Sequence, residues 1–147
     1  MAGLKTIRCT ADNIMDEPTT TQIPVAPGRK LLCIEDEHFI SELYARALTK
    51  AGYDVKVIID GIEGLTEAKT GRYDILLLDL MVPNLDGTHI LRELRSAKPP
   101  IKTKIIITTN LEEDAQHRHE IEAQADGYLI KAEITPRQLV EFLARVK

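Results

Sequence analysis

The chain has 147 residues, of which 44% are hydrophobic and 29% charged, and its formal net charge is −4. These values suit one globular domain, and the negative charge argues against nucleic-acid binding as the main task, because such domains usually carry a basic face. Two cysteines are too few for a disulfide framework. No apolar stretch reaches membrane-spanning length, and the N-terminus lacks the apolar core of a secretory signal. We therefore expect a reduced, cytoplasmic protein.

Residues 1–28 differ in composition from the rest of the chain. They hold three of the seven prolines and a run of three threonines, and no helical or strand period persists through them. This composition predicts a flexible N-terminal leader. The remaining residues, 29–147, are expected to form a single domain.

From Arg29 onward, strand-like apolar runs alternate with segments of helical period. The first run is continuously apolar, as in a strand that is covered on both faces. Asp60 with Glu63, and Thr135 with Gln138, have the spacing of helix N-terminal caps. The predicted strands cover 30–35, 54–58, 74–79, 104–109 and 127–130, and the predicted helices cover about 37–51, 61–70, 87–97, 111–124 and a segment that starts at Thr135-Pro136.

Strands that alternate with helices need crossover connections, which are right-handed and produce a parallel sheet. The sequence therefore predicts an α/β fold, a (βα)₅ unit arranged as a three-layer α/β/α sandwich. In such a fold the carboxyl ends of the strands open at one edge of the sheet, where open α/β sheets place their ligands.

Polar residues stand at the ends of four predicted strands: Glu35 and Asp36, then Asp79, Thr109 and Lys131. Each has an ordinary explanation alone, such as a helix cap or a solvated loop position. Clustered carboxylates, however, raise each other's pKa unless a cation neutralises them, and Mg²⁺ prefers oxygen ligands and often shares its shell with a phosphate. The set therefore predicts a divalent-metal and phosphoryl site at this edge.

Within such a site, Asp79 is a candidate nucleophile, because a carboxylate that attacks phosphorus forms an acyl phosphate. Lys131 would place a positive charge beside one phosphoryl oxygen, and the hydroxyl of Thr109 would donate to another. Thr108 competes for that last role, and the spacing favours Thr109.

The motifs as a set resemble those of one family. From about Arg29 to Lys147 the chain resembles the receiver domain of two-component response regulators, in the stand-alone form found among chemotaxis regulators. The resemblance is carried by the acidic pair after the first strand, by Pro83 and Asp86-Gly87 after the central aspartate, and by the spacing to Thr109 and Lys131. The matching segments are 31–37, 74–87, 105–110 and 127–131.

The resemblance implies a flavodoxin-like doubly wound sheet with strand order 2-1-3-4-5. It also implies roles for individual residues. Asp79 is the phosphoacceptor, and Thr109 and Tyr128 are the switch residues, with Lys131 conserved beside the acceptor. The implied Mg²⁺ ligands are Glu35, Asp36, Asp79 and the backbone carbonyl of Met81, and no organic cofactor is implied.

The implied partners are proteins. A sensor histidine kinase or a phosphotransfer protein would supply the phosphoryl group, and a downstream protein target would read the face formed by the fourth helix, fifth strand and fifth helix. The resemblance leaves homodimerisation through that face open, and implies no direct nucleic-acid or membrane partner. It implies no enzyme activity beyond the chain's own phosphorylation and dephosphorylation. Because no effector domain follows the last helix, we expect a stand-alone regulator or a fragment of a longer one.

The sequence departs from the family pattern at two positions. Ala132 stands where proline usually follows the lysine, so the loop after the fifth strand is expected to be set differently. Asn110 stands where alanine is frequent, and its larger side chain is expected to restrict access to an acyl phosphate. With the apolar Met81 and Leu111, this suggests slow dephosphorylation.

Three other functions compete with the receiver interpretation. A phosphatase of the haloacid dehalogenase type uses Asp-x-Asp, but Leu80 and Met81 follow Asp79. A flavodoxin-like cofactor binder needs a phosphate-cradling loop after the first strand, where Glu35 and Asp36 would repel phosphate. A receiver-like scaffold that is never phosphorylated stays open because of the two departures. A metal site at His117 and His119 is disfavoured, since positions i and i+2 of a helix do not face one another.

Overall fold

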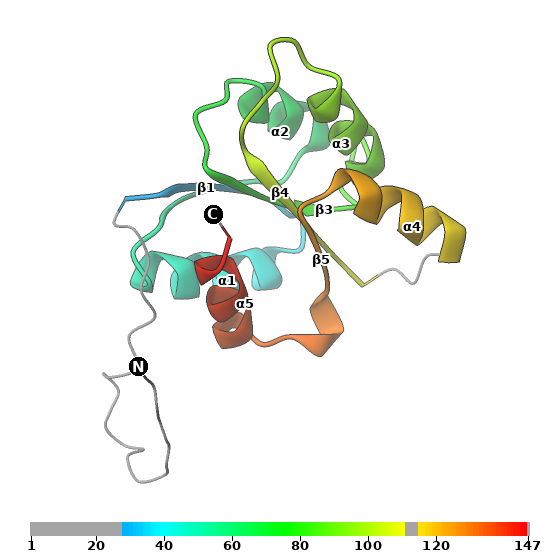
Figure 1. Ribbon diagram of the computed structural model, residues 1–147. Coiled ribbons are helices and arrows are strands. Elements are labelled where there is room, and N and C mark those ends of the chain that lie inside the picture. The colour runs from blue at the N-terminus through cyan, green and yellow to red at the C-terminus, as the bar shows by residue number, and fades with distance from the viewer. Residues whose placement is uncertain (1–27, 111–114, 147) are drawn as a thin grey trace, which may run out of the picture.

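Five parallel strands form the centre of the fold, in the order β2-β1-β3-β4-β5 (Figure 1). The structure, a computed structural model, describes residues 28–110 and 115–146, so the predicted leader lies outside it except for Gly28, as does Leu111. The predicted strand order is confirmed. The strands are β1 (Lys30–Ile34), β2 (Asp54–Ile58), β3 (Ile75–Asp79), β4 (Lys104–Thr109) and β5 (Gly127–Ile130).

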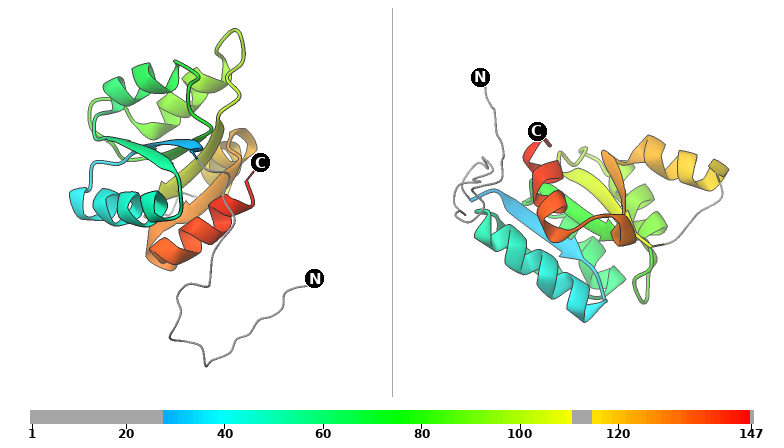
Figure 2. Two further views of the ribbon diagram at one scale, coloured as in Figure 1. Left: turned by 90° about the vertical axis from the view of Figure 1, so that its left-hand side faces the viewer. Right: turned by 90° about the horizontal axis from the view of Figure 1, so that it is seen from below.

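Helices cover both faces of the sheet, which makes the three layers expected from the sequence. One face is covered by α1 and α5, and the other by α2, α3 and α4 (Figures 1 and 2). A short 3₁₀ helix, η2 (Lys131–Glu133), follows β5. The α-helices are α1 (His38–Lys50), α2 (Gly61–Ala68), α3 (Gly87–Arg95), α4 (Ala115–Gln124) and α5 (Pro136–Ala144). None of the helices that the structure describes has the length and apolar character needed to cross a bilayer.

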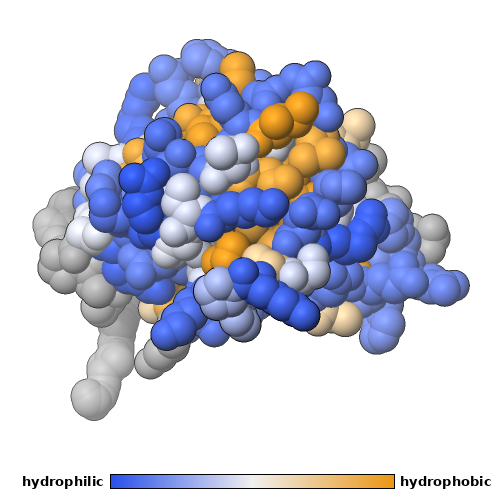
Figure 3. Space-filling model, turned by 90° about the horizontal axis from the view of Figure 1, so that it is seen from above, coloured by the Kyte–Doolittle hydropathy of each residue, from blue (hydrophilic) through white to orange (hydrophobic). Residues whose placement is uncertain are grey.

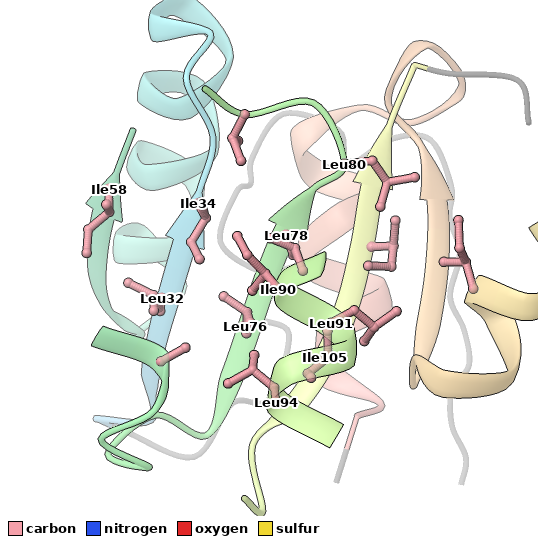
Figure 4. Packing of buried hydrophobic residues seen from close by; sticks show 14 residues of the cluster. Leu32, Ile34, Ile58, Leu76, Leu78, Leu80, Ile90, Leu91, Leu94 and Ile105 are labelled. Carbon is pink, nitrogen blue, oxygen red and sulfur yellow. The ribbon is translucent and has the colours of Figure 1, made fainter. Parts of the chain in front are cut away.

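Two apolar cores hold the layers together, because alternate residues of a strand point to opposite faces. In β1, Leu32 and Ile34 belong to the core under α2 and α3, whereas Leu31 and Cys33 belong to the core under α1 and α5. Figure 4 shows the first core, in which Leu76 and Leu78 of β3 face the side chains of α3. Fully burying one such side chain contributes about 2 kcal/mol, so the central strands anchor the residues at their ends.

The helix ends follow the predicted signals closely. The side chain of Asp60 accepts the N–H of Glu63 at the start of α2, and Thr135 and Gln138 form the predicted capping box of α5. The predicted boundaries of β1, β3 and the first three helices are one or two residues too long. Such small differences are usual where helix ends fray and strands run into loops.

Candidate functional site

Three carboxylates converge at the carboxyl edge of the sheet. Glu35 and Asp36 follow β1, and Asp79 ends β3; each offers an oxygen, and these oxygens lie within 4.8 Å of one another. They are close because β1 and β3 pair in parallel, with Ile34 opposite Leu78. Glu35 is 1% exposed and Asp79 4%, whereas Asp36 is exposed. The group predicted from the strand ends is therefore assembled in the fold.

Lys131 enters this cluster from the end of β5. Its Nζ donates to Glu35 Oε1 at 2.8 Å and to Asp79 Oδ2 at 3.1 Å, and it lies 3.5 Å from Glu37 Oε1. The lysine side chain is only 4% exposed. The fold thus brings Lys131 into contact with Glu35 and Asp79, and the contact with Glu37 was not predicted. The one sequence signal for this contact is the position of Glu37 directly after Glu35-Asp36.

The buried charges shift one another's pKa. Burial raises the pKa of Glu35 above its ordinary value, and the charge of Asp79 acts in the same direction, against the opposing hydrogen bond from Lys131. For Lys131, burial lowers the pKa, but the hydrogen bond to Glu35 and the charge of Asp79 outweigh it, so the net shift is upward. The lysine therefore stays protonated and neutralises part of the acidic charge.

One lysine does not balance the cluster. Glu35, Asp36 and Asp79 carry three negative charges when ionised, and Lys131 supplies one positive charge. Oxygen ligands gathered around a charge deficit fit a hard divalent cation such as Mg²⁺, which is bound through one or two carboxylates and keeps several waters. Among residues 28–110 and 115–146, the acidic, histidine and cysteine side chains grouped closely enough to share a metal ion are Glu35, Asp36 and Asp79. All three candidate ligands are carboxylates.

The loop after β3 holds Asp79 in place through the backbone. The N–H of Met81 donates to Asp79 Oδ1 at 3.1 Å, so both oxygens of this carboxylate have a donor. The N–H of Gly87 donates to Leu80 O at 2.9 Å, and a Cβ at Gly87 would overlap the carbonyl oxygen of Asp79. Glycine is therefore required where α3 begins, which gives a physical reason for the Asp86-Gly87 motif. The role of the Met81 carbonyl as a metal ligand stays a prediction.

Two buried threonines end β4. Thr109 is 0% exposed and Thr108 is 2% exposed. In the β3–β4 ladder, Thr108 is the residue opposite Asp79. Because side chains alternate along a strand, Thr109 shares the face of Ile107, which belongs to the core under α2 and α3. The choice of Thr109 over Thr108 as the phosphoryl-contacting hydroxyl remains a prediction.

Tyr128 lies on β5 beneath α4. Its hydroxyl is buried, and the guanidinium of Arg118 lies 4.6 Å from the centre of its ring, within the range of a cation–π contact. Arg118 is in turn bound to Glu122 at 3.1 Å. No sequence pattern indicated a role for Arg118, because α4 has no clear apolar stripe. The departure at Ala132 coincides with η2, in which Ala132 is the middle residue.

The family model described as the response regulator receiver domain matches residues 31–144. The chain is 38% identical over 118 residues to the transcriptional regulatory protein CusR of Escherichia coli (strain K12), covering 80% of this chain and 49% of CusR. It is 36% identical over 120 residues to the alkaline phosphatase synthesis transcriptional regulatory protein PhoP of Bacillus subtilis (strain 168), covering 82% of this chain and 48% of PhoP. The chain therefore spans about half the length of these relatives.

Solved structures agree with the sequence relatives. The chemotaxis protein CheY4 of Vibrio cholerae has a TM-score of 0.71 and 29% identity, over 82% of this chain and 99% of that one. The receiver domain of the sensor histidine kinase PA1611 of Pseudomonas aeruginosa PAO1 has a TM-score of 0.70 and 29% identity, over 80% and 96% of the two chains. That structure has a magnesium ion coordinated in its active-site cleft.

Proposed function

Because this chain belongs to the response regulator receiver domain family, we propose that it accepts a phosphoryl group on Asp79. The observation that carries the proposal is the convergence of Glu35, Asp36 and Asp79 around one buried lysine. We further propose that residues 29–147 form the receiver domain and that residues 1–28 form a leader. The domain acts as a phosphorelay receiver in two-component signalling, and its relatives are regulators rather than classical enzymes.

The proposed chemistry is transfer of a phosphoryl group to a carboxylate. An oxygen of Asp79 forms a bond to phosphorus while the bond from phosphorus to the donor breaks, and the donor leaves with that electron pair. Lys131, at 3.1 Å from Asp79 Oδ2, is placed to neutralise a phosphoryl oxygen, and Thr109 is the proposed hydroxyl donor. Positioning and electrostatics carry most of such a transfer.

Mg²⁺ is the proposed metal, held by Glu35, Asp36, Asp79 and the backbone carbonyl of Met81. When bound, it offsets negative charge on the transferring group. The magnesium in the PA1611 receiver domain, 29% identical to this chain, supports this assignment. The charge deficit of the acidic cluster supports it independently. The chain promotes its own aspartyl phosphorylation and dephosphorylation, without another catalytic activity.

The donor is proposed to be a protein, either a sensor histidine kinase or a phosphotransfer protein. Four large hydrophobic side chains that are more than half exposed lie on segments at or next to the carboxyl ends of β1, β2 and β3: Phe39, Ile59, Ile62 and Met81. Figure 3 shows hydrophobic residues reaching the surface on the side that carries α2 and α3. Exposed apolar groups beside a site favour a protein partner over a small phosphodonor alone.

The output is proposed to be a protein–protein contact. Tyr128 and Thr109 are the proposed switch residues, and Tyr128 links β5 to α4 through Arg118. The proposed output face is formed by α4, β5 and α5, and a homodimer through this face is one form of that contact. We propose a cytoplasmic location, as for a receiver in two-component signalling, and no direct nucleic-acid or membrane partner.

The test is phosphorylation of the purified chain. Incubation with Mg²⁺ and acetyl phosphate should add one phosphoryl group to the intact mass, and Asp79→Ala should abolish the adduct. Omitting Mg²⁺ should abolish it as well. A folded chain that neither binds Mg²⁺ nor gains the adduct would overturn the proposal and leave the scaffold that is never phosphorylated.

A further inference from the structure

The loop between β3 and α3, residues 80–86, is fastened to the N-terminus of α2. The N–H of Gly61 donates to Pro83 O at 2.9 Å, and Asn84 Nδ2 donates to Asp60 Oδ1. A Cβ at Gly61 would overlap the carbonyl oxygen of Leu85. The absence of a side chain at Gly61 therefore lets the loop lie directly against the first turn of α2.

The carboxylate of Asp60 makes two different contacts. Its Oδ2 accepts the N–H of Glu63 at 2.8 Å and caps α2, while its Oδ1 accepts the hydrogen bond from Asn84. These two contacts, with that from Glu63 the larger, hold the pKa of Asp60 below its ordinary value. Asn84 has a φ of +73°, a left-handed conformation that asparagine tolerates better than most residues. The asparagine thus suits both the backbone turn and the hydrogen bond.

The same loop meets the acidic cluster at its other end. The N–H of Met81 donates to Asp79 Oδ1 at 3.1 Å. Only Val82 and Pro83 separate Met81 from Asn84; Val82 is 7% exposed in the core, and the ring of Pro83 fixes its φ. With so little slack, a displacement of Asn84 moves the backbone of Met81.

We propose that Asn84 and Asp60 are positioning residues for the carboxylate site: their hydrogen bond holds the loop so that the Met81 backbone keeps its place beside Asp79. This inference rests on the proposed function, in which the carbonyl of Met81 is a Mg²⁺ ligand. Loss of such an outer partner typically weakens metal binding by about tenfold or more. Neither residue belongs to the acidic cluster itself.

An exchange of the two side chains tests the pair. Asn84→Asp places a second carboxylate beside that of Asp60, so the two repel. Asp60→Asn retains a residue type that is favoured as a helix N-cap. The double variant D60N/N84D restores the hydrogen bond with donor and acceptor exchanged, at the same net charge as the native chain. Mg²⁺ affinity is measured by titration calorimetry and unfolding free energy by urea in EDTA. Asn84→Asp is expected to weaken Mg²⁺ binding about tenfold, although its added charge alone would strengthen it, and the double variant is expected to recover most of the loss.

Two further variants separate positioning from general stability. Asn84→Gly keeps the left-handed conformation but removes the hydrogen bond, and is expected to weaken Mg²⁺ binding without a change of charge. Asp126→Asn breaks the ion pair with Arg95 at the opposite edge of the sheet, and is expected to lower stability while leaving Mg²⁺ affinity unchanged. The positioning role is wrong if Mg²⁺ affinity falls in proportion to stability in every variant. It is also wrong if the double variant D60N/N84D does not recover Mg²⁺ affinity relative to Asn84→Asp.

Hydrogen exchange of the Met81 amide, measured in metal-free protein, tests the positioning role independently of Mg²⁺ binding. In metal-free protein this amide is expected to lose protection in Asn84→Gly and Asn84→Asp and to regain it in the double variant. Absence of Mg²⁺ binding in the native chain would refute the proposed function. The hydrogen-exchange rate of the Met81 amide would still support or refute the positioning role. Unchanged protection of Met81 in both single variants would overturn the inference.

Discussion

The two edges of the sheet use the same side-chain chemistry in opposite ways. At the amino edge, acids have basic partners: Arg95 lies 2.8 Å from Asp126, and Glu67 lies 2.7 Å from Arg72 and 3.6 Å from Lys56. Asp74 accepts the backbone N–H of Lys30 at 2.8 Å. The side chains of Arg95 and Asp126 are each about 30% exposed, and Arg72 is 61% exposed, so these pairs stay partly in contact with water.

At the carboxyl edge, acids outnumber the base and two of them are buried. Glu35 and Asp79 pair with Lys131, and the more exposed Asp36 adds a third carboxylate to the cluster. An exposed, balanced pair adds little free energy to the fold, but a buried, unbalanced cluster is costly until a cation completes it. Location and charge balance, rather than residue type, therefore separate structural charges from a functional site.

Removing the lysine should have the largest effect. Lys131→Met leaves the Glu35 and Asp79 carboxylates buried without their cation, and breaking a buried pair costs about 3 to 5 kcal/mol. At the amino edge, Arg95→Met should cost at most about 1 kcal/mol, because its pair is partly exposed. Urea unfolding in EDTA measures both. Equal losses for the two variants would contradict the contrast between the edges.

A methyl group at the start of α3 should be nearly as damaging. Gly87→Ala places a Cβ against the backbone of Asp79 and Leu80, and relieving such an overlap costs about 3 kcal/mol. Gly71, near the amino edge, has a φ of +72° and open space around its Cβ position, so Gly71→Ala should cost only about 1 kcal/mol. Thermal unfolding compares the two. A Gly87→Ala protein as stable as Gly71→Ala would show that α3 can shift freely.

Mg²⁺ should stabilise the protein through the carboxyl edge of the sheet. A ligand at one hundred times its Kd raises the unfolding free energy by about 2.7 kcal/mol, so saturating Mg²⁺ should raise it by about that amount. Asp36→Asn should lose this gain while keeping its metal-free stability, because Asp36 is exposed and its neighbours Glu35 and Asp79 carry like charge. Urea unfolding with and without Mg²⁺ checks this, and an equal gain in Asp36→Asn would exclude that residue as a ligand.

Most of the fold could be predicted from the sequence because its signals are local. The bounds of β2, β4 and β5 match the apolar runs, and the caps at Asp60 and Thr135 depend on residues three positions apart. The acidic cluster was also predictable, since the carboxyl ends of parallel strands meet at one edge.

The missed contacts join distant parts of the chain. Asn84 and Asp60 are 24 residues apart, and no local pattern indicates that the β3–α3 loop lies on α2. Arg95 donates to Gln124 O at 2.5 Å, which ties α3 to the end of α4. The polar sequence of α4 did not indicate this contact, because α4 is held by single tertiary hydrogen bonds rather than by an amphipathic stripe.

The smallest effects are expected from two tyrosines at the amino edge. The hydroxyl of Tyr53 is buried and has no hydrogen-bond partner among the described residues, so Tyr53→Phe should be within about 1 kcal/mol of the native chain or more stable. The hydroxyl of Tyr73 donates to Glu67 Oε2 at 2.5 Å, so Tyr73→Phe should be less stable. Urea unfolding at neutral pH ranks the two variants.

The pH dependence separates these tyrosines further. Burial, and then the hydrogen bond to Glu67, raise the pKa of Tyr73 from 10.0 to about 12, so its contribution is complete below pH 10.0 and is lost as the pH rises through about 12. The same bond lowers the pKa of Glu67 below 4.5, so that contribution is present above pH 4.5 and is lost as the pH falls. The stability difference between the native chain and Tyr73→Phe should therefore be largest between these limits and shrink on either side. A difference that does not shrink below pH 4.5 or above pH 10.0 would show that the contribution of the Tyr73 hydroxyl does not depend on the charge of Glu67.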